Sequence, residues 1–216
     1  MEDVVMLIKE VCVENFTKIP AAIRNGAKRI ELNDNLAVGG TTVSRGVMAE
    51  SIHYAHEHNV AVMVMIRPRG GNFVYNDQEL KIMEADIFSA QELGADGIVL
   101  GCLTADNQID AEAMEMLMGA ANGMQIVFHM AFDAIPINQQ NGAMEWLIDH
   151  DVKRILTHGG PLDQPIDETR LKTLIEAAAG RIVILPGGGI TTDNVDALTT
   201  RLQVSEAHGT KIVGTL

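Results

Sequence analysis

Cysteine, aromatic residues and positive charge are all scarce in this chain of 216 residues. Only Cys12 and Cys102 carry thiols, far apart and without CxxC spacing, which excludes a disulfide framework and a thiolate zinc cluster. Lysine and arginine number 16 against 29 acidic residues, for a formal charge of -13. Such a surface repels polyanions, so we expect no nucleic-acid partner.

Long apolar runs are also missing. The opening stretch MEDVVMLIKEV places acids where a secretory signal carries positive charge, and its apolar part is too short to span a bilayer. No GxGxxG follows the first strand-like run, so the fingerprint of a dinucleotide site is absent. We therefore expect a cytoplasmic protein with no membrane partner and no organic cofactor.

What the chain does contain is a regular alternation of apolar, β-branched runs with segments of helical period. The predicted strands are 7–14, 29–33, 61–67, 97–103, 126–132, 154–158, 181–187 and 204–210. The predicted helices lie in 16–27, 44–58, 77–95, 110–122, 141–151, 167–180 and 191–203. Eight strands and seven helices predict an α/β fold, a (β/α)8 TIM barrel forming one domain over 1–216. Its last helix should be short or missing, because only KIVGTL follows the last strand. A doubly wound open sheet is the alternative, but the near-regular spacing favours closure.

In such a barrel the functional residues lie at the carboxyl ends of the strands. Polar side chains occur there at alternate positions, where a packed core would not tolerate them unpaired. We expect Glu10, Glu31, Arg67, Arg69, His129 and His208 to converge there, with Glu10, His129 and His208 as candidate acids or bases.

Two further features at these strand ends indicate anion binding. Arg67 and Arg69 stand where an apolar strand enters a glycine-bearing loop, and arginine has a fork of donors suited to carboxylate or phosphate. The run Gly187, Gly188 and Gly189 follows the seventh strand, where many barrels bind phosphate through backbone N–H groups. Alternatively, the arginines pair with Glu10, Glu31 or Glu206, and the glycines only form a tight turn.

Four motifs, in order along almost the whole chain, resemble the CutC family of copper homeostasis proteins. These are RIELNDNLAVGGTTVSRG, MIRPRGGNFVYND, IVFHMAFD and RIVILPGGGIT. The resemblance implies a cytosolic (β/α)8 barrel that is dimeric or a higher homo-oligomer and is associated with Cu(I). Cu(I) is soft and prefers sulfur ligands, so Cys12 is the expected metal ligand.

The chain departs from this family at two positions. Asn33 stands where the copper-binding members carry a second cysteine, so a two-thiolate site on the first two strands cannot form. Met130 replaces the arginine between His129 and Asp133. Two functions stay open: a protein that handles copper through Cys12, and a barrel enzyme that acts on a small phosphate or carboxylate substrate.

Overall fold

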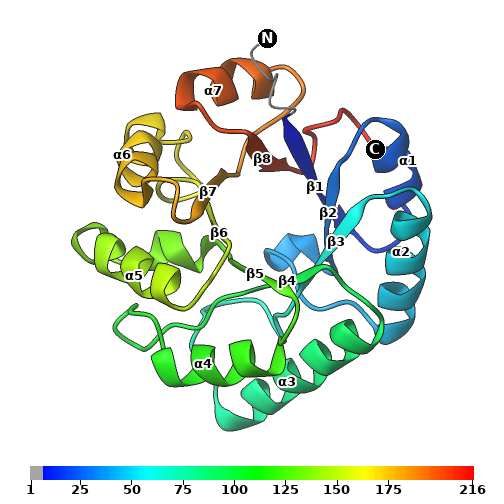
Figure 1. Cartoon of the computed structure of the whole chain (residues 1–216), viewed down its shortest axis with the longest axis horizontal. Coiled ribbons are helices and arrows are strands. Elements are labelled where there is room, and N and C mark those ends of the chain that lie inside the picture. Colours follow the sequence, from blue (N-terminus) through cyan, green and yellow to red (C-terminus); the bar gives the residue numbers. More distant parts are fainter. Residues whose placement is uncertain (1–6) are drawn as a thin grey trace.

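The computed structural model describes residues 7–216, and all eight predicted strands form in it. They are β1 (Ile8–Glu14), β2 (Arg29–Asn33), β3 (Ala61–Met65), β4 (Gly97–Leu100), β5 (Gln125–Phe128), β6 (Arg154–Thr157), β7 (Val183–Pro186) and β8 (Glu206–Gly209). They make one parallel sheet in the order β7-β6-β5-β4-β3-β2-β1-β8. Figure 1 shows this sheet curled into a barrel with the helices around it, which confirms the predicted fold class.

Seven α-helices connect the strands, as predicted. They are α1 (Ile19–Arg24), α2 (Arg45–Glu57), α3 (Asp77–Glu92), α4 (Ala111–Ala120), α5 (Ile137–Asp149), α6 (Glu168–Ala178) and α7 (Val195–Leu202). Several begin at side-chain caps that the sequence carries; for example, Asn76 and Glu79 form a capping box at the start of α3. Helix α5 begins earlier than predicted, directly after Pro136. Among residues 7–216, no helix is both long and apolar enough to cross a membrane.

Several predicted strands run past the observed ends, and the fifth is the most consequential. We expected strand 126–132, but β5 ends at Phe128 and a 3-10 helix, η2 (Met130–Ala134), follows directly. The apolar run continues through Phe132, which is why periodicity did not reveal the break. The turn matters because His129 caps η2 and is thereby placed at the mouth of the barrel.

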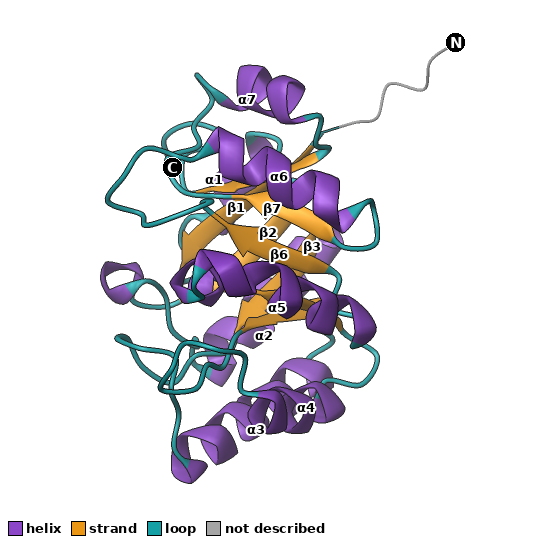
Figure 2. Cartoon of the chain, turned by 90° about the vertical axis from the view of Figure 1, so that its left-hand side faces the viewer, coloured by secondary structure: helices purple, strands orange, loops and turns teal. Residues whose placement is uncertain are grey.

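Apolar side chains fill two separate regions. The larger core lies between the strands and the surrounding helices, which cover the barrel on its outside in Figure 2. A smaller cluster fills part of the lumen and consists of Met63, Met65, Val99, Val127, Leu156 and Leu185, from β3 to β7. The lumen-facing positions of β8, β1 and β2 carry ionisable groups instead, including Glu10, Glu31 and His208, all buried. The polar half of the lumen therefore holds the candidate site.

The barrel has one seam. In the described part of the chain, hydrogen-bonded ladders join every pair of neighbouring strands except β7 and β8. Beyond these strands, an isolated parallel bridge joins Thr191 to Lys211. Within residues 7–216 no helix follows β8, and the C-terminal end lies beside α1 (Figure 1).

Candidate functional site

A cavity of about 740 Å³ opens at the carboxyl ends of the strands. Of the residues predicted from the sequence, Cys12, Arg67, His129, His208, Gly188 and Gly189 line it. Glu10, Arg69 and Gly187 are not part of its wall. The rest of the wall includes Met65, Phe73, Met130 and Leu156, so the cavity is apolar on one side and ionisable on the other.

Three potential metal ligands meet at the ionisable side. A sulfur of Cys12, a carboxylate oxygen of Glu31 and a ring nitrogen of His208 all lie within 4.8 Å of one another. Adjacent strands place them there, because Cys12 pairs in register with Glu31 across β1 and β2, while β8 lies on the other side of β1. The Glu31 Oε1 atom is buried without a hydrogen-bond partner, so this corner has an unused acceptor that a cation could occupy.

Asn33 borders the same cluster. Its Nδ2 lies 3.4 Å from Cys12 Sγ and donates to Glu31 Oε2 at 2.8 Å. Its Oδ1 packs against Gly40, where an added Cβ would lie 2.2 Å away. The side chain at position 33 therefore reaches the Cys12 sulfur, as the family pattern of two thiols implied.

A layer of buried ion pairs supports the cluster from below. Glu10 accepts hydrogen bonds from Arg29 and from His208 Nδ1, the latter at 2.8 Å. Arg29 also binds Glu206 at 2.6 Å, and Arg154 binds the same carboxylate at 2.7 Å. The sequence-based alternative, in which Arg67 or Arg69 neutralises Glu10, Glu31 or Glu206, is therefore wrong. Arg29 pairs with Glu10 and Glu206, and Arg154 pairs with Glu206, whereas Glu31 faces His208 Nε2 at 3.8 Å.

This layer sets the protonation states of the cluster. Burial would raise the pKa of Glu10, but Arg29 and His208 outweigh it and lower the pKa to about 2. Burial would lower the pKa of His208, but Glu31 and Glu10 raise it. Burial and the Glu31 carboxylate raise the pKa of the Cys12 thiol well above its usual value. Without a bound cation, Cys12 is therefore a neutral thiol at neutral pH.

The lowered pKa of Glu10 predicts a loss of stability in acid. A carboxyl group whose pKa is depressed by folding contributes stability that is complete above its unfolded pKa. For Glu10 that contribution should vanish as the pH falls from about 4.5 to about 2. We expect urea-unfolding free energies to fall over this interval, and Glu10→Gln should flatten the curve. Equal slopes for the two proteins would contradict the assignment.

Arg67 reaches the cavity without any acidic partner. Its guanidinium donates to the backbone carbonyls of Val38, Gly40 and Gly71 at 2.8 to 2.9 Å. The side chain is buried, and none of the ion pairs among residues 7–216 includes it. Its positive charge is consequently compensated by carbonyl dipoles and by the face of the Phe73 ring, whose centroid lies 5.1 Å from Arg67 Cζ.

Arg69, in contrast, is a loop anchor. It forms an ion pair with Glu79 at 2.5 Å and donates to the carbonyls of Gly70, Asn72 and Val74. The expected convergence of Arg69 with the other predicted residues in the mouth is wrong, because Glu79 in the first turn of α3 holds the side chain. Sequence could not show this, since the partner lies beyond the loop.

His129 is held in one tautomer by its own turn. Its Nδ1 accepts a hydrogen bond from Ala131 N at 3.2 Å, so the ring proton lies on Nε2. Burial, reinforced by the positive charge of Arg67, lowers the pKa of His129 to about 3. The residue is therefore a neutral donor at physiological pH, and Nε2 is buried with no partner.

The three glycines of the predicted run, 187–189, have two different environments. Gly187 donates to Thr157 O and extends the β6–β7 ladder, so its N–H group is already used. Gly188 and Gly189 both have positive φ and lie in the cavity wall. A Cβ at Gly188 would lie 2.5 Å from His158 Nδ1, so this position requires glycine for packing as well as for its backbone conformation.

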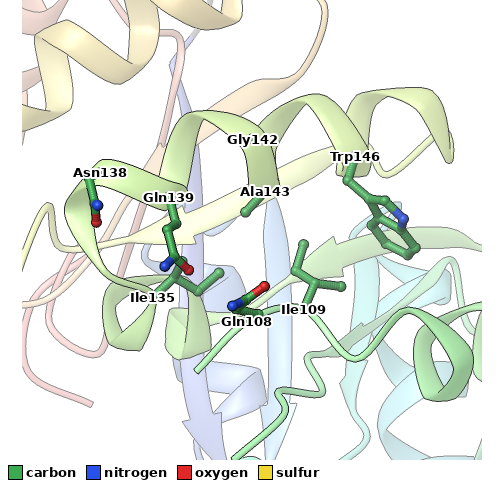
Figure 3. Close-up of a pocket in the computed structure, with 8 residues that line it drawn as sticks. All are labelled: Gln108, Ile109, Ile135, Asn138, Gln139, Gly142, Ala143 and Trp146. Atoms are coloured by element: carbon green, nitrogen blue, oxygen red, sulfur yellow. The ribbon is translucent and has the colours of Figure 1, made fainter. Parts of the chain in front are cut away.

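A second hollow of about 440 Å³ lies outside the barrel, between α5 and the segment before α4 (Figure 3). Its wall is formed by Gln108, Ile109, Ile135, Asn138, Gln139, Gly142, Ala143 and Trp146. None of these side chains is ionisable or a strong metal ligand. This hollow therefore offers no acid, base or metal ligand comparable to those of the barrel cavity.

Two features of this site were not predicted from the sequence: the grouping of Glu31 and His208 with Cys12, and the position of Phe73. Glu31 was expected among the salt-bridge partners and His208 among the acids and bases. The signal was available in the alternation along each strand combined with closure of the barrel, which makes β8 a neighbour of β1. For Phe73, on the loop after β3, no pattern in the sequence indicates that it lines the cavity.

Known proteins share both this barrel and its sequence. The family model described as CutC family matches residues 7–213. A CutC family protein from Enterococcus faecalis is 59% identical, covering 96% of this chain and 100% of that protein. A human copper homeostasis protein cutC homolog is 41% identical, covering 93% of this chain and 72% of that protein. The crystal structure of CutC from Streptococcus agalactiae, 48% identical, superimposes with a TM-score of 0.93 over 96% of this chain and 100% of that one.

The structure defines a parallel (β/α)8 barrel protein whose lumen holds a buried cluster of potential metal ligands. The chain belongs to the CutC family, as its four motifs indicated.

Proposed function

We propose that this protein takes part in copper homeostasis and binds one Cu(I) ion in the barrel cavity. The observation that carries the proposal is the meeting of Cys12, Glu31 and His208 within 4.8 Å, with Glu31 Oε1 unpartnered. The human and streptococcal relatives are named as copper homeostasis proteins, which points to copper as the metal. The three side chains of the cluster are compatible with Cu(I). Sulfur and imidazole nitrogen are ligands that Cu(I) accepts well, whereas the carboxylate is a weaker partner.

The surrounding residues would prepare each ligand. His208 donates its Nδ1 proton to Glu10, so its Nε2 is the atom directed toward Glu31, at 3.8 Å. A carboxylate behind a ligating imidazole fixes the ring and raises its basicity. The cation would replace the protons of Cys12 and His208, and it would relieve the repulsion that Glu31 imposes on a Cys12 thiolate.

Replacing Cys12 tests the copper proposal. We expect the natural protein to take one Cu(I) from a chromophoric chelator under reducing conditions. Cys12→Ser should lose at least about 100-fold in affinity, because the only sulfur at the cluster is gone. Cys102→Ser is the matched control, since Cys102 is buried in the outer core and is not part of the cavity wall. Equal losses in both variants, or in neither, would overturn the proposal.

A barrel enzyme acting on a small anion is the second candidate function. Arg67 favours it, because a buried arginine with no acidic partner at a cavity wall is suited to hold an anionic group. In that case His129 and His208 would be the groups nearest the substrate. Glu10 would act through His208, which it contacts from below. Gly188 and Gly189 would add backbone donors.

The family resemblance also supports a cytoplasmic location and self-association into a dimer or higher homo-oligomer. Large apolar side chains such as Ile137 and Leu162 are 68% and 61% exposed and could be covered by another copy. Light scattering on the purified protein measures this directly.

A further inference from the structure

Two residues of the cavity wall, from the ends of different strands, each have a buried N–H group without a hydrogen-bond partner among residues 7–216, although the Tyr75 hydroxyl, also buried without a partner, lies beside Arg67. One is Nε of Arg67 after β3, and the other is Nε2 of His129 after β5. Each residue is only 4% exposed. A buried donor without an acceptor is costly, so such groups occur where something else supplies the acceptor.

The remaining contacts of Arg67 define what can bind. Three of the five guanidinium hydrogens are given to the carbonyls of Val38, Gly40 and Gly71, which hold the group in place. The unused Nε–H therefore has a fixed direction, and the full positive charge has no counterion among the side chains of residues 7–216. A guanidinium arranged in this way favours an anionic oxygen ligand.

His129 sets the charge of that ligand. The ring is neutral because Nδ1 accepts from Ala131 N, and Nε2 contributes a donor without adding charge. One positive charge and two separate N–H donors match a monoanion with two oxygens. A phosphate dianion would leave one negative charge uncompensated beside the Glu31 carboxylate of the same cavity.

Phe73 packs against both residues. Its ring centroid lies 4.8 Å from that of His129 and 5.1 Å from Arg67 Cζ, and the ring lines the cavity. It belongs to the irregular segment between β3 and α3, where it is only partly buried. Rotation of this side chain would change the cavity wall beside Arg67 and His129 without moving a strand.

We propose that Arg67 and His129 form a binding site for the carboxylate group of a small organic acid, with Phe73 packed beside it. The acid's carbon skeleton would lie against the apolar wall of Met65, Met130 and Leu156. This inference deepens the second candidate function by naming its ligand class, and it requires neither copper nor catalysis.

The first test uses the natural protein. With ¹⁵N-labelled histidine, the Nε2–H signal of His129 should shift saturably on titration with pyruvate or acetate. Inorganic phosphate at matched ionic strength should leave it in place. Absence of a saturable shift with either carboxylate up to about 10 mM, well above a millimolar Kd, would overturn the proposal. An equal response to phosphate would overturn the choice of carboxylate.

The second test separates the two donors by equilibrium dialysis of labelled pyruvate. His129→Leu, which has no donor, should lose at least about tenfold in affinity, and His129→Gln, which keeps an N–H, should recover part of it. Arg67→Lys should also lose about tenfold, because lysine has the charge without the directed Nε–H. Arg45→Ala, on the exposed surface of α2, is the control and should bind normally. Unchanged binding in both His129→Leu and Arg67→Lys would refute the site.

The outcomes also separate this inference from the proposed functions. Carboxylate binding without turnover of any carboxylate would keep the site and remove the enzyme function. Copper titrations of the same variants report independently on Cys12, Glu31 and His208.

Discussion

Asn33→Cys should bind Cu(I) about 100-fold more tightly than the natural protein, a gain of about 2.7 kcal/mol. The side chain at this position already reaches within 3.4 Å of Cys12 Sγ through its Nδ2 atom. A thiolate there would give the soft ion a second sulfur ligand in place of an amide. Competition against a Cu(I) chelator, with a reductant present to keep both thiols free, measures the change.

Asn33→Ser is the matched control for that experiment. It removes the amide and its hydrogen bond to Glu31 without adding sulfur, so it should show no comparable gain. If Asn33→Cys and the natural protein bind equally, Cu(I) is not held at Cys12.

Arg29→Met should destabilise the fold by about 3 to 5 kcal/mol. Arg29 is 4% exposed and binds both Glu10 and Glu206, and its removal leaves the Glu10 carboxylate with only His208 as a partner. A buried charge without its counterion is far more costly than a lost surface pair. Urea unfolding at neutral pH, far above the pKa of Glu10, measures the effect.

Two further variants are the controls for this measurement of stability. Arg45→Ala breaks an ion pair whose side chains are 55% and 66% exposed, and should cost less than about 1 kcal/mol. Adding Glu10→Gln to Arg29→Met should restore much of the lost stability, because the buried charge is then removed as well. A double variant no more stable than Arg29→Met would show that packing, not charge, is responsible.

The fold could be read from the sequence because strands of a parallel barrel are buried on both sides. Runs such as 61–65 and 97–100 are therefore almost continuously apolar, and loops with caps and glycines separate them. The same property concealed the end of β5, since Phe132 continues the apolar run into η2. Local pattern finds elements well and their ends poorly.

The site was only partly predictable for a different reason. Alternation along a strand tells which residues face the lumen, and the three residues it placed there, Cys12, His129 and His208, line the cavity. It does not tell which partner each will meet, because that depends on register and on loops. Arg69 forms its ion pair with Glu79. Arg29 pairs with Glu10 and Glu206, two of the carboxylates that Arg67 and Arg69 were expected to neutralise.

Within residues 7–216, the seam between β7 and β8 is the joint of the barrel that has no ladder of hydrogen bonds to hold it. A closed cylinder of strands can widen only by breaking ladder hydrogen bonds, whereas at this joint the backbone is held by the isolated bridge between Thr191 and Lys211. Cys12, Glu31 and His208 all stand on β8, β1 and β2, which remain laddered to one another. The spacing of these three side chains therefore depends on the β8–β1–β2 ladders and not on the joint.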